Sequence, residues 1–274
     1  MKASRVFVYV LLIGGLLLFL SPLYEMLAIS LKTPQEMATT SLWAWPKNLT
    51  WDNFKEVITN PNVSFPLFAR NTIFLAVTCT AGVTITSGLT AFAFARLRFP
   101  GRDRLFAILL STMMLPAIVT MVPSYVIFAK IHWVNTFLPL TVPAWLGGGA
   151  FNVFLLRQFF LTHPRELDEA AIMDGASYST IFWKILMPLS GPAVATVAVF
   201  TFIGTWRDFM GPLIYLNDPD KQTLEVGLST FQGLNSEQWH LIMAGATLVM
   251  LPLIVIFILC QRYFVKGITM TGLK

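Results

Sequence analysis

Six long apolar runs constrain this 274-residue chain more than any other feature of its sequence. About 20 consecutive apolar residues are enough to cross the hydrocarbon core of a bilayer as a helix. Backbone amides inside a bilayer must be paired within their own segment, so each run is expected to be helical despite the prolines it contains. The six expected spans are residues 6–31, 68–95, 105–129, 137–161, 189–215 and 241–265.

The composition agrees with a membrane location. Hydrophobic residues make up 55% of the chain and charged residues only 12%, whereas a soluble domain carries about 25% charged residues. The first run follows Lys2 and Arg5 in the manner of a secretory signal, but no small-residue cleavage site follows it promptly, so we interpret it as a retained helix. Residues 1–274 are therefore expected to form a single all-α transmembrane domain.

The distribution of Lys and Arg predicts the orientation. If the N-terminus is inside the cell, 12 of the 19 basic residues lie on the cytoplasmic side, and this excess places both termini in the cytoplasm. The cytoplasmic set is Lys2, Arg5, Arg96, Arg98, Arg102, Arg104, Arg157, Arg165, Lys184, Arg262, Lys266 and Lys274. The outer set is Lys32, Lys47, Lys55, Arg70, Lys130, Arg207 and Lys221. Since no basic patch is interleaved with aromatic residues, no nucleic-acid partner is expected.

The sequence lacks the residues that would drive chemistry or ion coupling. Carriers driven by protons or sodium need ionisable groups at mid-membrane depth, and the interiors of the second, third and sixth spans have none. His132, His163 and His240 are scattered and do not have metal-ligand spacing, so no metal site is expected. No nucleophile elbow or phosphate-binding glycine loop is present, so we expect a protein that is not an enzyme. Energy for uphill transport would have to come from another polypeptide.

A few polar residues in the spans leave two interpretations open. Glu25 is either an interfacial carboxylate or part of a path, and Arg207 with Asp208 forms either a solvated interfacial pair or part of an outer vestibule. Five residues are candidates for lining a path, although hydrogen bonding between helices is the favoured explanation for the first four. They are Asn71, Asn152, Thr201, Trp206 and Arg207. Gly147, Gly148 and Gly149 permit either close helix packing or local unwinding.

Residues 162–188, here called the acidic segment, are a water-soluble stretch between the fourth and fifth spans. They contain Glu166, Asp168, Glu169 and Asp174, four of the chain's 14 acidic residues. Acidic residues are favoured at a helix N-terminus, and Gly175 is suited to the left-handed conformation that ends a helix. The acidic segment is therefore expected to be two short helices joined by a glycine turn.

The second of these helices is expected to carry an apolar stripe. Ser177 is a suitable N-cap, and Pro188 is expected to end the helix. The stripe, at positions i, i+3, i+4 and i+7, is formed by Tyr178, Ile181, Phe182 and Ile185. Small Ala170 and Ala171 would let another protein approach the backbone closely. We therefore interpret the acidic segment as a docking element for a cytoplasmic partner, in preference to a simple connecting loop.

The order of residues in this segment resembles the EAA loop of ABC importer permeases. Glu169-Ala170-Ala171 is followed by three residues, Gly175, nine residues and Ile185-Leu186-Met187-Pro188, with Met187 where the family has leucine. That exchange conserves side-chain volume. Residues 223–233 and 261–274 are similar to the maltose-type permease subunit, although the family's final glycine is absent. Trp206-Arg207-Asp208-Phe209 stands where the family has Trp-Asn-Glu-Phe.

The resemblance implies a six-helix permease with a cytoplasmic coupling helix between the fourth and fifth spans, held in a cleft of an ATPase subunit. Coupling residues implied by it are Glu169, Ala170, Ala171, Asp174, Gly175, Ile185 and Pro188. Residues 266–274 would form a cytoplasmic tail that contacts the ATPases through Gly267, Thr269, Gly272 and Lys274. The chain itself would bind no cofactor, since ATP and Mg²⁺ would belong to the ATPases.

The implied assembly contains a second homologous permease, two ATPase subunits and an extracytoplasmic solute-binding protein, in the inner membrane of a prokaryotic cell. Its expected substrate is a mono-, di- or oligosaccharide. Two alternatives stay open at this point. One is an importer of a sugar phosphate or polyol, which a cationic Arg207 would favour. The other is a membrane scaffold that recruits a cytoplasmic protein through the acidic segment.

Overall fold

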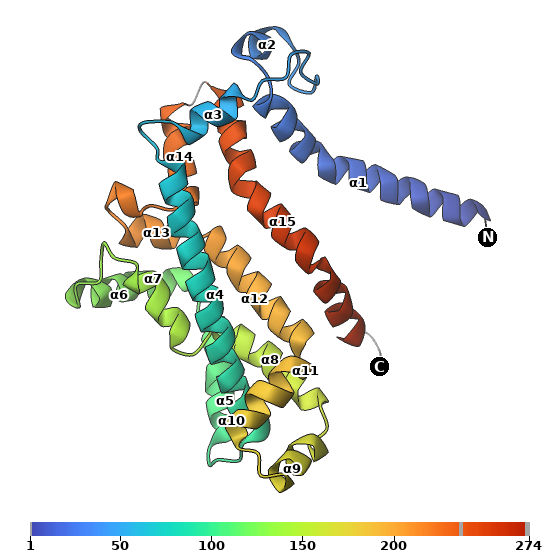
Figure 1. Ribbon diagram of the computed structural model, residues 1–274, viewed down its shortest axis with the longest axis vertical. Helices are drawn as coiled ribbons and strands as arrows, with labels where there is room; N and C mark the ends of the chain where they lie inside the picture. The colour runs from blue at the N-terminus through green and yellow to red at the C-terminus, as the bar shows by residue number, and fades with distance from the viewer. Residues whose placement is uncertain (1, 236–237, 272–274) are drawn as a thin grey trace. The chain divides into compact units, whose positions relative to one another are not determined.

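The computed structural model describes residues 2–235 and 238–271, and the elements in these ranges are helical (Figure 1). The first part of the chain contains α1 (Lys2–Ser30), α2 (Pro34–Thr39), α3 (Asp52–Ile58), α4 (Phe65–Arg96), α5 (Arg102–Ser111), η1 (Thr112–Met114), α6 (Ala117–Lys130), α7 (Leu138–Thr141), η2 (Val142–Trp145) and α8 (Ala150–Thr162). The second part contains α9 (Glu166–Met173), α10 (Tyr178–Thr180), η3 (Ile181–Leu186), α11 (Met187–Leu189), α12 (Gly191–Trp206), α13 (Met210–Tyr215), η4 (Pro219–Lys221), α14 (Leu224–Leu234) and α15 (Trp239–Thr271).

Four segments within the described ranges are long and apolar enough to cross a membrane. They are Val6–Ser30, Phe65–Arg96, Leu138–Thr162 and Trp239–Gln261. Two bent helix pairs, Arg102–Met114 with Ala117–Lys130 and Tyr178–Leu189 with Gly191–Trp206, raise the number to six if each counts as one span. These six places correspond to the six apolar runs, and the all-helical membrane fold expected from the sequence is confirmed at this level.

Prolines and glycines break several spans that hydropathy alone presents as continuous. The third run bends by 99° between η1 and α6, where Pro116 adopts an extended conformation that cannot continue the helix. The fourth run unwinds at Gly147, Gly148 and Gly149, all at positive φ. Gly148 also packs closely, because its carbonyl accepts a hydrogen bond from the Ser87 hydroxyl at 3.0 Å. Both roles considered for the glycines therefore occur together.

The chain divides into two compact units, which are described separately. The first comprises residues 1–67 and 226–254. Its α1 leaves most apolar side chains exposed, as suits a helix surrounded by lipid. The loop after α1 is closed around Lys32, a fully buried residue whose ammonium donates to the carbonyls of Ser41 at 2.7 Å and Leu42 at 3.2 Å. Asn53 donates from its amide to the carbonyls of Ser30 and Lys32, both at 2.8 Å, which fixes α3 to the end of α1.

The second unit comprises residues 68–225 and 255–274 and contains the acidic segment. Its core lies where the C-terminal part of α4 meets α8, α9, η3 and α12. Figure 1 shows α9 and α10 at that end of α4. The buried core residues are Ala91, Phe92, Ala95, Val153, Leu156, Phe160, Ala171, Ile181, Phe182, Leu186, Ala193 and Val197. The acidic segment is therefore part of the hydrophobic core and is not a loose connection.

Candidate functional site

The first half of the acidic segment folds as the sequence predicts. Helix α9 carries its acidic residues in the first turn and ends at a glycine with φ of 81°. The turn is closed by hydrogen bonds from the Gly175 amide to the Ile172 carbonyl and from the Ala176 amide to the Ala171 carbonyl, both at 2.9 Å. Ser177 then caps α10 by accepting a hydrogen bond from the Thr180 amide at 3.2 Å. The glycine turn and the serine cap are both confirmed.

The second half departs from the expected α-helix. Ile181–Leu186 form a π-helix, in which hydrogen bonds run from i to i+5 and shift the buried face. The predicted stripe is wrong at Tyr178, which is 59% exposed, whereas Ile181 and Phe182 are each 1% exposed. Leu186, which was outside the predicted stripe, is fully buried. The π-turn adds a residue to the helical repeat, so the apolar face no longer follows a 3.6-residue period.

Pro188 does not end this helix, contrary to the prediction. The chain remains helical through α11 to Leu189 and bends by 83° before α12. Pro188 is the second residue of α11, which follows η3 directly. The direction of the chain therefore changes at Ser190 instead.

Arg96, the last residue of α4, holds the acidic segment at two points. Its Nε lies 3.1 Å from Asp168 Oδ2, in an ion pair whose side chains are only 4% and 14% exposed. Its Nη2 donates to the carbonyl of His163 at 3.0 Å. The ring of His163 in turn contacts the Ser190 hydroxyl, with Nε2 and Oγ 3.1 Å apart. At its base, the start of the acidic segment is therefore joined to α4 and to Ser190, two residues beyond the segment's end.

Burial shifts the pKa values of Asp168 and His163, which lie where the acidic segment joins α4. Burial raises the pKa of the Asp168 carboxyl, and the positive charges of Arg96 and Arg165 oppose that rise without cancelling it. Burial lowers the pKa of the His163 imidazole, and the neighbouring Arg96 charge lowers it further against the opposing effect of Asp168. The site thus favours a neutral His163 beside a paired buried carboxylate.

The predicted coupling residues divide into an outward and an inward set. Glu169, Ala170, Asp174 and Gly175 are exposed on α9 and its turn, whereas Ala171 is buried in the core. Ile185 is half-buried and Pro188 is exposed. Beside the outward set lie three exposed apolar side chains that sequence reasoning did not single out, namely Leu167, Ile172 and Met173, the last being 87% exposed. These three apolar residues stand among acidic residues in the sequence, and that pattern could have indicated a contact surface.

Two of the predicted path residues have structural partners. Asn71 is buried and donates from its amide to the carbonyls of Asp220 at 2.8 Å and Gln222 at 3.0 Å. Asn152 donates to the Gly148 carbonyl at 2.9 Å. The Asn71 contacts join α4 to a distant part of the chain, which is the alternative to a path role that the sequence left open, whereas the Asn152 contact lies within its own segment.

The other path candidates lie in different environments. Trp206 is 2% exposed and stacks with Phe202, with ring centroids 5.5 Å apart. Thr201 is half-buried and Arg207 is exposed. The carboxylate of Asp208 accepts a hydrogen bond from the Gly211 amide at 3.0 Å and so caps α13. Of the tail residues, Gly267 and Thr269 lie within α15, while Gly272 and Lys274 lie outside the described residues.

A polar line along α4 was missed by the sequence analysis. Thr80, Thr84 and Ser87 follow the i, i+4, i+7 spacing of one helix face, which could have revealed them. The hydroxyls of Thr80 and Thr84 are buried and have no hydrogen-bond partner among the described residues.

Comparison with known proteins places these features in a family. Residues 84–270 match the family described as "binding-protein-dependent transport system inner membrane component". The chain is 34% identical over 273 residues to the sn-glycerol-3-phosphate transport system permease protein UgpE of Pectobacterium atrosepticum, covering 97% of this chain and 96% of that protein. It is 30% identical to the arabinooligosaccharides transport system permease protein AraQ of Halalkalibacterium halodurans, covering 100% and 99% of the two chains.

Further relatives agree in length and fold. The chain is 31% identical to the trehalose/maltose transport system permease protein MalG of Thermococcus litoralis, with 96% of each chain covered. In structure it resembles a chain from a bacterial ABC transporter involved in the import of the acidic polysaccharide alginate, with a TM-score of 0.85 and 23% identity over 96% of this chain and 98% of that one. The protein therefore belongs to the binding-protein-dependent transport system inner membrane components, the permease family of ABC importers.

Proposed function

We propose that this chain is one permease subunit of an ATP-driven importer and forms half of the pathway by which a sugar crosses the cell membrane. In this proposal it spans the membrane six times with both termini in the cytoplasm. A second homologous permease supplies the other half of the pathway, and an extracytoplasmic binding protein delivers the solute. ATP and Mg²⁺ bind to a pair of separate ATPase subunits, so this chain carries no catalytic residue.

The observation that carries the proposal is the construction of the acidic segment. Its outward face combines exposed Leu167, Ile172 and Met173 with Glu169 and Asp174, a mixture typical of a surface that docks on another protein. Its inward face is packed in the core beside α4, α8 and α12. A partner that moves this face would therefore move the spans, which is the behaviour required of a coupling helix.

The residues proposed to meet the ATPase are Glu169, Ala170, Asp174 and Gly175, supported from behind by Ala171, Ile185 and Pro188. The tail residues Gly267, Thr269, Gly272 and Lys274 are proposed as a second contact with the ATPases. Asn71, Asn152, Thr201, Trp206 and Arg207 stay proposed path residues, although Asn71 and Asn152 already have backbone partners. Thr80 and Thr84 join them because their hydroxyls are buried without a partner among the described residues.

Sugar is favoured as the substrate class by the relatives named for arabinooligosaccharides and for trehalose and maltose. A sugar phosphate or polyol is the second candidate, supported by the relative named for sn-glycerol-3-phosphate and by the exposed cation of Arg207. Uptake competition in vesicles separates the two. Inhibition by neutral oligosaccharides supports the first candidate, whereas inhibition by glycerol phosphate alone supports the second.

The coupling role is tested at Gly175, where backbone conformation can be changed without steric conflict. No atom lies within 4 Å of the place that a Cβ would occupy, but φ is 81°. Valine is strongly disfavoured at this φ, whereas asparagine tolerates it. We expect Gly175→Val to reduce substrate-stimulated ATP hydrolysis in the reconstituted assembly by at least about tenfold, while Gly175→Asn retains most of it. Equal stimulation in the two variants would contradict the proposed role.

A further inference from the structure

A cavity lined by arginines lies beside the acidic segment, and the coupling role does not account for it. Its volume is about 620 Å³. It is lined by Arg98, Phe99, Gly101, Arg102, Asp103, Arg104 and Arg165. These residues come from the loop between α4 and α5, from the first turn of α5 and from the residue before α9. Four arginines and one acidic residue thus line the cavity.

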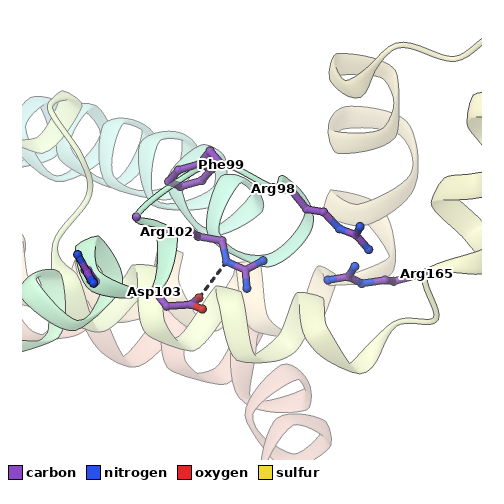
Figure 2. Close-up of a pocket in the computed structure, with 7 residues that line it drawn as sticks. Arg98, Phe99, Arg102, Asp103 and Arg165 are labelled. Atoms are coloured by element: carbon purple, nitrogen blue, oxygen red, sulfur yellow. Dashed lines mark hydrogen bonds and ion pairs between the residues drawn. The ribbon is translucent and has the colours of Figure 1, made fainter.

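The positive charges of this cavity are largely uncompensated. Asp103 pairs with Arg102, whose Nε lies 3.0 Å from Asp103 Oδ1. In the part of the chain that the structure describes, no acidic side chain forms an ion pair with Arg98, Arg104 or Arg165. Asp168, whose pKa is raised by burial and lowered in part by the Arg165 charge, is already paired with Arg96. Figure 2 shows the guanidinium groups of Arg98 and Arg165 pointing toward one another across the cavity, with that of Arg102 directed into the same space.

Like charges that face one another in this way repel, so the arrangement is favourable when an anion lies between them. Guanidinium groups bind phosphate through paired, charge-assisted hydrogen bonds. A phosphate group matches both the sign of the charge and the fork geometry of several arginines around one space. A phosphate group therefore suits this cavity.

The surroundings indicate that the phosphate belongs to a lipid. Helix α5 leaves this cavity as the start of a candidate membrane span and buries none of its residues. Phe99 lines the cavity itself, and Leu105 and Ile108 on α5 are 50% and 61% exposed. An apolar helix face that begins at a cluster of arginines suits a molecule with an anionic head and hydrocarbon chains. Basic pockets at the cytoplasmic ends of spans bind anionic headgroups in this manner.

We propose that this cavity binds an anionic phospholipid of the cytoplasmic leaflet. Arg98, Arg102 and Arg165 hold the headgroup phosphate, Arg104 adds to the positive field, and the acyl chains lie along α5. The bound lipid joins the loop before α5 to the start of α9, two parts of the second unit that are distant in sequence. An adjoining cavity of about 460 Å³ shares Arg98, Phe99 and Arg165 and extends to Glu169 and Ile172, so the headgroup lies beside the proposed coupling surface.

The test measures lipid binding to the full-length chain purified in detergent, by native mass spectrometry. Three probes are compared, namely phosphatidylglycerol, phosphatidylcholine and inorganic phosphate. The wild-type chain is expected to retain phosphatidylglycerol in preference to phosphatidylcholine. Each arginine near an anionic lipid surface contributes about fivefold in affinity, so Arg104→Gln lowers phosphatidylglycerol binding about fivefold and Arg98→Gln with Arg165→Gln lowers it about 25-fold. All three arginines are exposed, so their replacement is expected to leave the fold intact.

Arg70→Gln is the matched control, because Arg70 is an exposed arginine near the opposite end of α4. Its phosphatidylglycerol binding should equal that of the wild type. Equal retention of both lipids, or unchanged binding in the Arg98→Gln, Arg165→Gln double variant, overturns the proposal. Displacement of phosphatidylglycerol by millimolar inorganic phosphate assigns the cavity to free phosphate and also overturns it. Because none of these readouts requires transport, a negative result here is separate from failure of the proposed importer function.

Discussion

At the residue scale, Arg96 has the greatest structural effect on the site, because it binds the acidic segment through both a carboxylate and a carbonyl. Its ion pair with Asp168 is almost entirely buried. Removing one member of a buried pair leaves the other charge without compensation, whereas removing both does not. This asymmetry predicts a specific pattern in a double-mutant cycle.

Arg96→Gln and Asp168→Asn are each expected to lower the free energy of unfolding by about 3 kcal/mol, and the double variant by less than the sum. Denaturation of the purified chain in detergent measures all three. Arg102→Gln is the control, since its pair with Asp103 is far more exposed and should contribute less than about 1 kcal/mol. Strict additivity of the two single effects would show that Arg96 and Asp168 do not interact.

The lowered pKa of His163 predicts a loss of stability in acid. A histidine that is neutral in the folded state contributes fully above its usual pKa of roughly 6.5. That contribution is lost as the pH falls through the usual pKa toward the lowered folded-state pKa. We expect the free energy of unfolding of the purified chain to fall as the pH is lowered from about 7.5 to about 5.5, and the fall to be smaller in His163→Gln. A His132→Gln variant, changed at an exposed histidine, should keep the wild-type profile.

Local residue patterns predicted Gly175 and Ser177 correctly, because a left-handed turn and an N-cap depend on a few neighbouring residues. The partners of Arg96 could not be predicted in the same way. Arg96 and Asp168 come from different parts of the chain, and only packing of α4 against α9 brings them together. The contacts of Arg96 with Asp168 and His163 therefore could not be predicted from the sequence, although the three residues themselves could be read there.

At the element scale, the π-helix η3 decides which side chains anchor the acidic segment. Phe182 is 1% exposed and its ring centroid lies 5.5 Å from that of Phe92, whereas the adjacent Trp183 is 47% exposed. The sequence predicted a helix here, but the added residue of a π-turn depends on how the element packs in the core. Hydropathy similarly located the third and fourth runs without showing their breaks at Pro116 and the glycine triplet.

The two adjacent aromatic residues provide a matched test of this element. Phe182→Ala should lower the free energy of unfolding by about 3 to 5 kcal/mol, because it leaves a cavity in the core. Trp183→Ala should lower it by less than about 1 kcal/mol, because Trp183 is 47% exposed and is not one of the buried core residues. Thermal unfolding of both variants in detergent measures the difference. Similar losses in the two would mean that η3 buries a different face.

At the scale of the whole molecule, orientation in the membrane is the expectation on which the coupling role depends. Charge counting places the acidic segment in the cytoplasm and the loop between α2 and α3 outside. Met173 and Trp43 report on these two sides, being 87% and 56% exposed. Hydropathy and charge predicted this arrangement of the chain, but they carry no information about the solute, which depends on a few side chains along the path.

Cysteine labelling in intact cells tests the orientation. In a chain whose Cys79 and Cys260 are replaced by serine, Trp43→Cys should react with a membrane-impermeant maleimide added outside. Met173→Cys should react only after the cells are opened. Labelling of Met173→Cys from the outside would reverse the orientation and remove the basis for contact with a cytoplasmic ATPase.

The joined base of the acidic segment has a mechanical consequence. Since His163 contacts Ser190 and Arg96 binds both His163 and Asp168, these contacts would resist straightening of the acidic segment by a pull near Met173. In the proposed assembly, a load applied there would be transmitted to α4, α8 and α12, whose buried side chains share one core with the acidic segment. A conformational change in an ATPase bound there would then move these helices together with the acidic segment.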